Sequence, residues 1–140
     1  MTDRKRVLIL CTGNSARSQM AEGILRHHFG EKYDVESAGI EPSHVRAEAI
    51  EAMLEIGIDI SDHRSKSVDV FADRDFDYVI TVCDNANERC PIYPSGTERI
   101  HWSFSDPAAV SGNEELRLAA FRKVRDEIRE RIVEQFGSES

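Results

Sequence analysis

Apolar residues occur along this chain in two alternating patterns, short continuous runs and longer stripes with helical spacing. The runs RVLIL at 6–10 and DYVITV at 77–82 leave no polar face, which predicts strands buried on both sides. The segments YDVESAG at 33–39 and RIHW at 99–102 are bounded by turn-forming residues and predict two further strands. The chain is therefore expected to contain a sheet of about four strands.

The stripes between the strands predict helices. Apolar positions three and four residues apart extend from 15 to 29, where Gly30 supplies a stop, and from 44 to 57, where the segment closes on Gly57. The segment 65–75 predicts a short third helix. The last helix is the most regular, with an apolar stripe formed by Leu118, Phe121, Val124, Ile128, Ile132 and Phe136.

The alternation of strands and helices predicts an α/β fold. Right-handed crossovers would give a three-layer sandwich, in which a four-stranded parallel sheet is covered by helices on both faces. At 140 residues the chain is expected to form a single domain over 1–140. Ligands of such sheets bind where the strands end, and Cys11, Cys83 and Asp106 follow three of the predicted strands. These three side chains are therefore expected to share one edge of the sheet.

The charge balance narrows the possible partners. A formal net charge of −8 argues against a protein that binds nucleic acid or a membrane surface, because such proteins need a basic face. The first apolar run ends at Cys11, which is too short for a signal-peptide core or a membrane span, so a cytoplasmic protein is expected. Three cysteines are an odd number in a reducing compartment, and a static disulfide framework is not expected.

The segment CTGNSARS, residues 11–18, is the strongest candidate for chemistry. Cys11 and Arg17 stand in a C-x5-R pattern between a strand and a helix, where main-chain N–H groups without helical partners can bind a tetrahedral oxyanion. Arg17 would add a planar fork of donors to the same anion. Gly13 and Asn14 tolerate left-handed backbone, as a tight anion-binding turn requires.

The same surroundings bear on the sulfur of Cys11. Helix N–H groups and Arg17 would lower its pKa below the ordinary value, and Ser18 could donate its hydroxyl to the sulfur. The alternative is a small buried cysteine that ends a strand, but the Gly, Asn and Ser inside the pattern favour an anion site. The oxyanion-binding residues are thus expected to be Thr12, Gly13, Asn14, Ser15, Ala16, Arg17 and Ser18.

Five stretches together resemble a known family: CTGNSARSQMAEG, SAGIEP, AIEAMLEIGIDIS, TVCDNANERCP and HWSFSDPA. They are similar to the thioredoxin-coupled arsenate reductases built on the low-molecular-weight phosphotyrosine phosphatase fold. The resemblance implies that Cys11 attacks arsenate, that Arg17 binds its oxygens and that Asp106, of the D-P pair, is the general acid. It also implies that Asn14 and Ser18 shape the loop and stabilise the thiolate. Arsenate, with phosphate or sulfate as mimics, thioredoxin as reductant and a role in arsenical resistance are the expectations that follow.

Two further cysteines decide between the chemistries of that fold. A phosphatase hydrolyses its phosphocysteine with water, whereas a reductase needs a second thiolate to attack Cys11 and a route to regenerate it, which Cys83 and Cys90 would supply. Incidental cysteines are one alternative, and a zinc site is another, although C-x6-C is uncommon for zinc and His101 is the one histidine nearby in sequence. A tyrosine phosphatase and a redox-sensing oxyanion-binding module without turnover remain as alternative functions.

Two departures from the phosphatase pattern favour the reductase, with weak phosphatase activity as a side reaction. Ala16 stands where phosphatases of the fold usually have a second cysteine in the loop. Alanines, rather than aromatic residues, follow Asp106 and Pro107.

Some reductases of the family bind potassium beside the loop, and this chain matches the ligands of that site only in part. Asn14, Glu22 and Ser37 match three of its ligands, but Lys66 stands where a carboxylate is expected. The ammonium group of Lys66 would replace the ion by pairing with Glu22, or Lys66 is an ordinary exposed lysine. We therefore expect neither a metal nor a cofactor.

Overall fold

The sheet lies at the centre of the molecule and is parallel throughout. A computed structural model describes residues 4–71, 74–83 and 97–137. Its strands lie in the order β2 (Tyr33–Gly39), β1 (Lys5–Cys11), β3 (Tyr78–Thr81) and β4 (Glu98–His101). The register places Cys11 opposite Gly39, so the candidate loop leaves the sheet beside the end of β2. All four predicted strands are present, and the α/β fold is confirmed.

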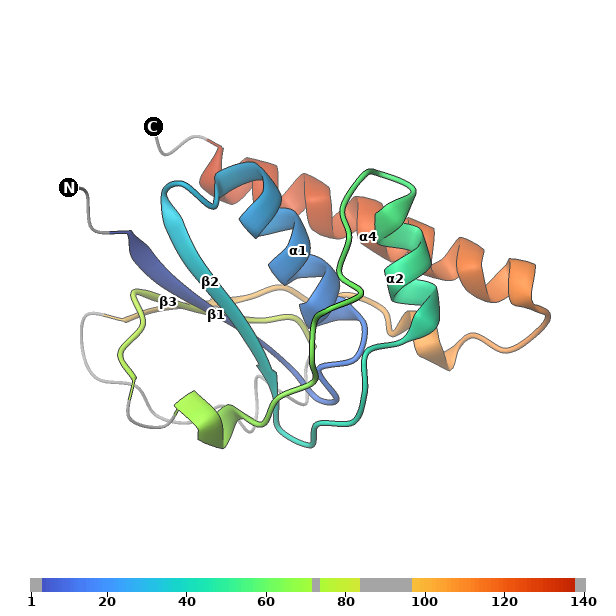
Figure 1. Cartoon of the computed structure of the whole chain (residues 1–140), viewed down its shortest axis with the longest axis horizontal. Coiled ribbons are helices and arrows are strands. Elements are labelled where there is room, and N and C mark those ends of the chain that lie inside the picture. Colours follow the sequence, from blue (N-terminus) through green and yellow to red (C-terminus); the bar gives the residue numbers. More distant parts are fainter. Residues whose placement is uncertain (1–3, 72–73, 84–96, 138–140) are drawn as a thin grey trace.

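Two helices, α1 (Arg17–Phe29) and α4 (Glu114–Phe136), cover one face of this sheet, and Figure 1 shows them packed side by side. The shorter helix α2 (Ala47–Leu54) packs against both of them. The ring of Phe136 near the end of α4 meets Tyr33 of β2 at 4.9 Å and Tyr78 of β3 at 5.8 Å between centroids. These aromatic contacts hold α4 against the sheet.

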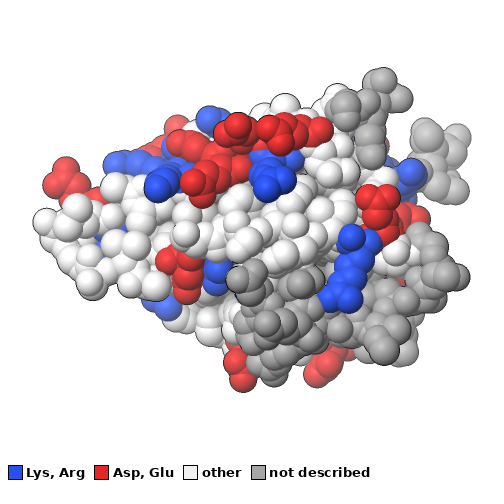
Figure 2. Space-filling view, turned by 180° about the vertical axis from the view of Figure 1, so that it is seen from behind, with Lys and Arg blue, Asp and Glu red and all other residues white. Residues whose placement is uncertain are grey.

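The apolar stripe of α4 is buried at every position expected, from Leu118 to Phe136. Its other face carries acidic and basic side chains, and Figure 2 shows the two signs mixed along the upper part of the surface. No helix among the described residues is both long enough and apolar enough to cross a membrane.

Two helices are shorter than the sequence predicts. The helix expected over 44–57 begins at Ala47 because Arg46 is extended, with φ −70° and ψ 138°, and it ends at Leu54 before Gly57 turns the chain with φ +81°. The third helix, expected over 65–75, is a single 3₁₀ turn, η1 (Val68–Phe71). Ser67 pairs with Gly39 in a parallel bridge, which keeps the chain extended up to the start of η1. Figure 1 shows η1 on the side of the strands opposite α1 and α4.

Candidate functional site

The loop between β1 and α1 has its carbonyl groups turned outward. Each carbonyl from Cys11 to Ala16 accepts a hydrogen bond from outside the loop's centre. The donors are Ile40 N to Cys11 O (3.2 Å), Glu41 N to Thr12 O (2.8 Å), Ser43 N to Gly13 O (3.1 Å), Gln19 Nε2 to Asn14 O (3.1 Å), Arg46 N to Ser15 O (2.9 Å) and Met20 N to Ala16 O (2.9 Å). With the carbonyls held there, the opposite side of the loop presents main-chain N–H groups at the N-terminus of α1. This arrangement suits a tetrahedral anion.

Asn14 sets the shape of the loop. It is fully buried and has φ +48°, a left-handed conformation that asparagine adopts more readily than most residues. Its side-chain amide donates to Ser18 Oγ at 2.8 Å and to Ser37 Oγ at 3.0 Å, while its Oδ1 accepts from Lys66 N at 2.8 Å. The left-handed conformation expected of Asn14 is therefore confirmed.

Two expectations about the loop are wrong. Gly13 is not among the residues with positive φ, so the turn needs the left-handed conformation at Asn14 alone. The hydrogen bonds of the described residues include none from Ser18 to the sulfur of Cys11. Ser18 is instead fully buried beneath the amide of Asn14.

Gly39 allows β2 to approach the loop closely. A Cβ atom at Gly39 would lie 2.8 Å from Thr12 O, which a hydrogen bond from Glu41 N holds in place, and 2.9 Å from the main-chain atom Asn14 N. A Cβ at Gly13 would lie 3.4 Å from two serine hydroxyls, Ser15 Oγ and Ser43 Oγ, and would meet nothing closer. The conformation of the loop therefore depends more on Gly39 of β2 than on Gly13 within the loop.

We expect Gly39→Ala to lower the free energy of unfolding by about 1–3 kcal/mol, as overpacking against fixed atoms does, and to weaken phosphate binding. Gly13→Ala is the matched control and should change the free energy of unfolding less. Urea denaturation of both variants, with and without phosphate, measures the difference. Equal losses of stability in the two variants would contradict this account of Gly39.

Arg17 and Asp106 meet at the mouth of the loop. Arg17 is 12% exposed at its side chain, donates to Phe104 O at 3.1 Å and lies 3.8 Å from Asp106 Oδ2. Asp106 accepts a hydrogen bond from Ala108 N at 3.0 Å, which caps η2 (Pro107–Ala109), and its side chain is 46% exposed. The structure thus brings the D-P aspartate to the guanidinium of the loop, at the sheet edge where it was expected.

Cys11 and Cys83 lie together at that edge. Both are buried and neither forms a disulfide. Cys83 Sγ lies 3.2 Å from Thr12 Oγ1, in the residue that follows Cys11, so the two thiols are close enough to affect each other's ionisation. The expected meeting of these two cysteines is present in the geometry, whereas Cys90 lies outside the described residues.

The neighbouring thiol changes the acidity of Cys11. Its contact with Cys83, followed by burial, raises the pKa of Cys11 above the ordinary value, and Arg17 and the main chain of Thr12 oppose the rise. The expectation of a lowered pKa is therefore wrong for this arrangement. Arg17 and the loop act in the expected direction, but a second buried thiol outweighs them.

We expect Cys83→Ala to lower the pKa of Cys11, because it removes the contact that raises that pKa most. A lower pKa means more thiolate at neutral pH and faster alkylation. Iodoacetamide labelling at Cys11, followed by peptide mass spectrometry from mildly acidic to alkaline pH, compares the variant with the wild type. An unchanged midpoint would show that Cys83 does not govern the acidity of Cys11.

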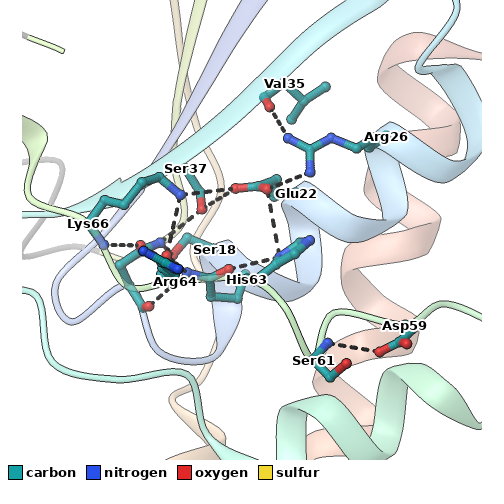
Figure 3. Close-up of polar contacts among 12 residues, drawn as sticks. Ser18, Glu22, Arg26, Val35, Ser37, Asp59, Ser61, His63, Arg64 and Lys66 are labelled. Atoms are coloured by element: carbon teal, nitrogen blue, oxygen red, sulfur yellow. Dashed lines mark hydrogen bonds and ion pairs between the residues drawn. The ribbon is translucent and has the colours of Figure 1, made fainter. Parts of the chain in front are cut away.

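Behind the loop, a buried carboxylate gathers several partners. Glu22 accepts from Ser37 Oγ at 2.6 Å, pairs with Arg26 at 2.9 Å and Lys66 at 3.8 Å, and lies 3.7 Å from His63 Nδ1, as Figure 3 shows. The side chain of Lys66 is 26% exposed and points toward Glu22 from the side opposite Arg26. Lys66 therefore has the internal ion pair of the first alternative and is not an ordinary exposed lysine.

Sequence reasoning missed two side chains that support the loop. Gln19 is fully buried on α1, where its Nε2 donates to Asn14 Oδ1 at 2.9 Å and to Arg64 O at 2.9 Å. His63 Nδ1 lies 3.0 Å from Gln19 Oε1, and burial lowers the pKa of His63. A glutamine within the apolar stripe of a helix was the available signal, since a buried amide needs partners. His63 gave no signal, because its partners come from a distant helix.

Within residues 4–71, 74–83 and 97–137, no three histidine, cysteine, aspartate or glutamate side chains are placed to hold an ion.

Comparison with known proteins identifies the family. The family model described as low molecular weight phosphotyrosine protein phosphatase matches residues 6–138. The chain belongs to this family. An arsenate reductase of Halalkalibacterium halodurans is 49% identical over 130 residues, which cover 93% of this chain and 94% of that protein.

Solved structures agree with this assignment to the low molecular weight phosphotyrosine protein phosphatase family. An arsenate reductase in the phosphate binding state is 35% identical and has a TM-score of 0.78, with 97% of this chain and 99% of that chain covered. The Corynebacterium glutamicum thioredoxin-dependent arsenate reductase is 31% identical, with a TM-score of 0.75, and the match covers 98% of this chain and 62% of that chain. The fold and family that the sequence motifs suggest are confirmed.

Proposed function

We propose that this family member is an arsenate reductase in which a tetrahedral arsenate is bound by the N–H groups of residues 12–18 and by Arg17. The observation that carries the proposal is the position of a second buried thiol, Cys83, beside that loop, with its Sγ 3.2 Å from Oγ1 of Thr12, the neighbour of Cys11. A phosphatase needs one thiol, whereas reduction of arsenic needs a second sulfur within reach of the first. The names of the relatives support the same substrate.

In the first step Cys11 releases its proton to solvent, attacks arsenic as the thiolate and displaces one oxygen. That oxygen leaves as water when Asp106 donates a proton, and the product is a thiol-arsenate adduct with an S–As(V) bond. Arg17 and the loop N–H groups stabilise the charge that develops on the remaining oxygens. Asp106 is near enough for this role because it already pairs with Arg17.

In the second step Cys83 attacks the sulfur of Cys11. A Cys11–Cys83 disulfide forms, the S–As bond breaks, and its electron pair reduces As(V) to As(III), which leaves as arsenite. Cys90 then attacks Cys83, which releases the Cys11 thiol and leaves a Cys83–Cys90 disulfide. The dithiol of thioredoxin reduces that disulfide and is itself oxidised. The use of thioredoxin rests on one structural neighbour and on the sequence resemblance.

Hydrolysis of phosphate esters is the second candidate function, because the matching family model is that of phosphatases. Both reactions begin with Cys11 and the same anion site. A redox-sensing module that binds the anion and reacts once is the third.

One experiment separates these three functions. Arsenate is supplied with thioredoxin, thioredoxin reductase and NADPH, and NADPH oxidation is followed beside hydrolysis of an aryl phosphate. Sustained NADPH oxidation that depends on arsenate supports the reductase. Aryl phosphate hydrolysis without it supports the phosphatase. One equivalent of arsenite without further turnover supports the sensing module.

A further inference from the structure

Two arginines attached to the loop have the same unusual feature. Among the described residues, the side-chain nitrogen atoms that are buried without a hydrogen-bond partner are Arg17 Nε and Arg46 Nε. Buried donors are nearly always paired in proteins, so each of these two calls for a reason. Arg17 has one, since it belongs to the oxyanion site. Arg46 has no place in the mechanism above.

Arg46 is joined directly to the oxyanion loop. Its main-chain N–H donates to Ser15 O at 2.9 Å, and its own carbonyl accepts from Ala49 N at 3.1 Å at the start of α2. The residue is only partly exposed. Its side chain therefore starts directly beside the loop, at the segment 40–46 that bonds to the loop carbonyls.

The charge of Arg46 is not neutralised by the acids around it. Among the described residues its side chain makes no hydrogen bond and no ion pair. The acidic residue in the first turn of α2, Glu48, pairs instead with Arg117 of α4 at 3.7 Å. Arg122, by contrast, is fully engaged by Glu55, with Nη2 at 2.6 Å from Oε2. Arg46 thus differs from Arg117 and Arg122 in having no acidic partner among the described residues.

A positive charge beside the loop would help to attract an anion. The protein carries a net charge of −8, which repels a doubly charged oxyanion at long range, so the approach to the loop depends on local cations. Arg17 alone is partly offset by Asp106. We propose that Arg46 is a second anion-binding residue of this site, which attracts the tetrahedral oxyanion to the loop and binds one of its outward oxygens. This inference rests on the loop being the oxyanion site of the proposed function.

The test measures how well inorganic phosphate protects Cys11 from alkylation by iodoacetamide. Iodoacetamide is uncharged, so Arg46 does not steer it, and the rate without phosphate reports any change in Cys11 itself. Arg46→Gln keeps the main-chain bond to Ser15 and removes the charge. The phosphate concentration for half-protection should rise about three- to tenfold, as expected for losing one charge near a dianion. In about 1 M salt, where the Debye length is about 3 Å, the difference should shrink.

Two matched variants complete the test. Arg46→Lys retains the charge and should stay within about twofold of the wild type, and Arg122→Gln changes the net charge equally at a distant ion pair and should also stay within about twofold. The proposal is overturned if Arg46→Gln behaves like Arg122→Gln, or if Arg46→Lys loses as much affinity as Arg46→Gln. Thermal unfolding of each variant confirms that it is folded. Because phosphate protection requires no arsenate reduction, it can succeed or fail independently of the proposed function.

Discussion

Replacement of Cys11 by serine is expected to abolish arsenate reduction, with turnover lowered by at least about a thousandfold. A serine hydroxyl is a poor nucleophile at neutral pH and cannot form the disulfide that carries electrons to arsenic. The loop itself should survive, because its carbonyl groups are held by neighbouring segments and not by the sulfur. Any hydrolysis of aryl phosphate should be lost to the same extent, since both reactions begin at Cys11.

The coupled NADPH assay measures this loss. Phosphate binding, followed by calorimetry, is the control and should persist in Cys11→Ser. Arsenate-dependent turnover close to that of the wild type would remove Cys11 from the reaction, and loss of phosphate binding together with activity would mean only that the loop had collapsed.

Serine substitutions at Cys83 and Cys90 are expected to separate the two chemistries. Neither thiol is needed for attack on the anion, so hydrolysis of aryl phosphate, where the wild type performs it, should continue. Arsenate turnover with thioredoxin should fall to background in both variants, because each breaks the disulfide relay at a different step. Cys83→Ser should stop at the thiol-arsenate adduct, and Cys90→Ser at a Cys11–Cys83 disulfide.

Mass spectrometry of the intact protein after one equivalent of arsenate distinguishes these end points. Cys83→Ser should show no disulfide that involves Cys11, and Cys90→Ser should release one equivalent of arsenite. Continued turnover of Cys90→Ser with thioredoxin as the sole reductant would exclude Cys90 from the mechanism.

The fold could be predicted from the sequence because its signals are local. Continuous apolar runs mark the parallel strands, and β2 has the boundaries expected, 33–39. The boundaries that failed depend on distant partners. Arg46 is extended because it bonds to Ser15, and Ser67 is extended because it pairs with Gly39. Neither of these two long-range contacts can be read from the apolar pattern of the helix that it shortens.

Some features of the candidate site could also be predicted from the sequence, whereas others depend on distant contacts. Cys11, Arg17 and Asp106 could be placed together because strand ends of a parallel sheet meet at one edge. The contact of Cys83 with Cys11 follows from that placement, but its effect on the pKa of Cys11 does not, since the balance between Arg17 and a second thiol depends on distance and burial. Gln19 and His63 were missed for a similar reason, because their roles depend on packing between elements.

The groups that hold the loop carbonyls all come from the first 66 residues, whereas Cys83 and Asp106 come from the second half of the chain. In the proposed mechanism, the loop that binds the anion thus comes from the first half of the chain, whereas the general acid and the second thiol come from the second half. Evolution can therefore alter the second half, replacing hydrolysis by reduction or changing the reductant, without rebuilding the first. A single anion-binding half can in this way serve a family with more than one chemistry.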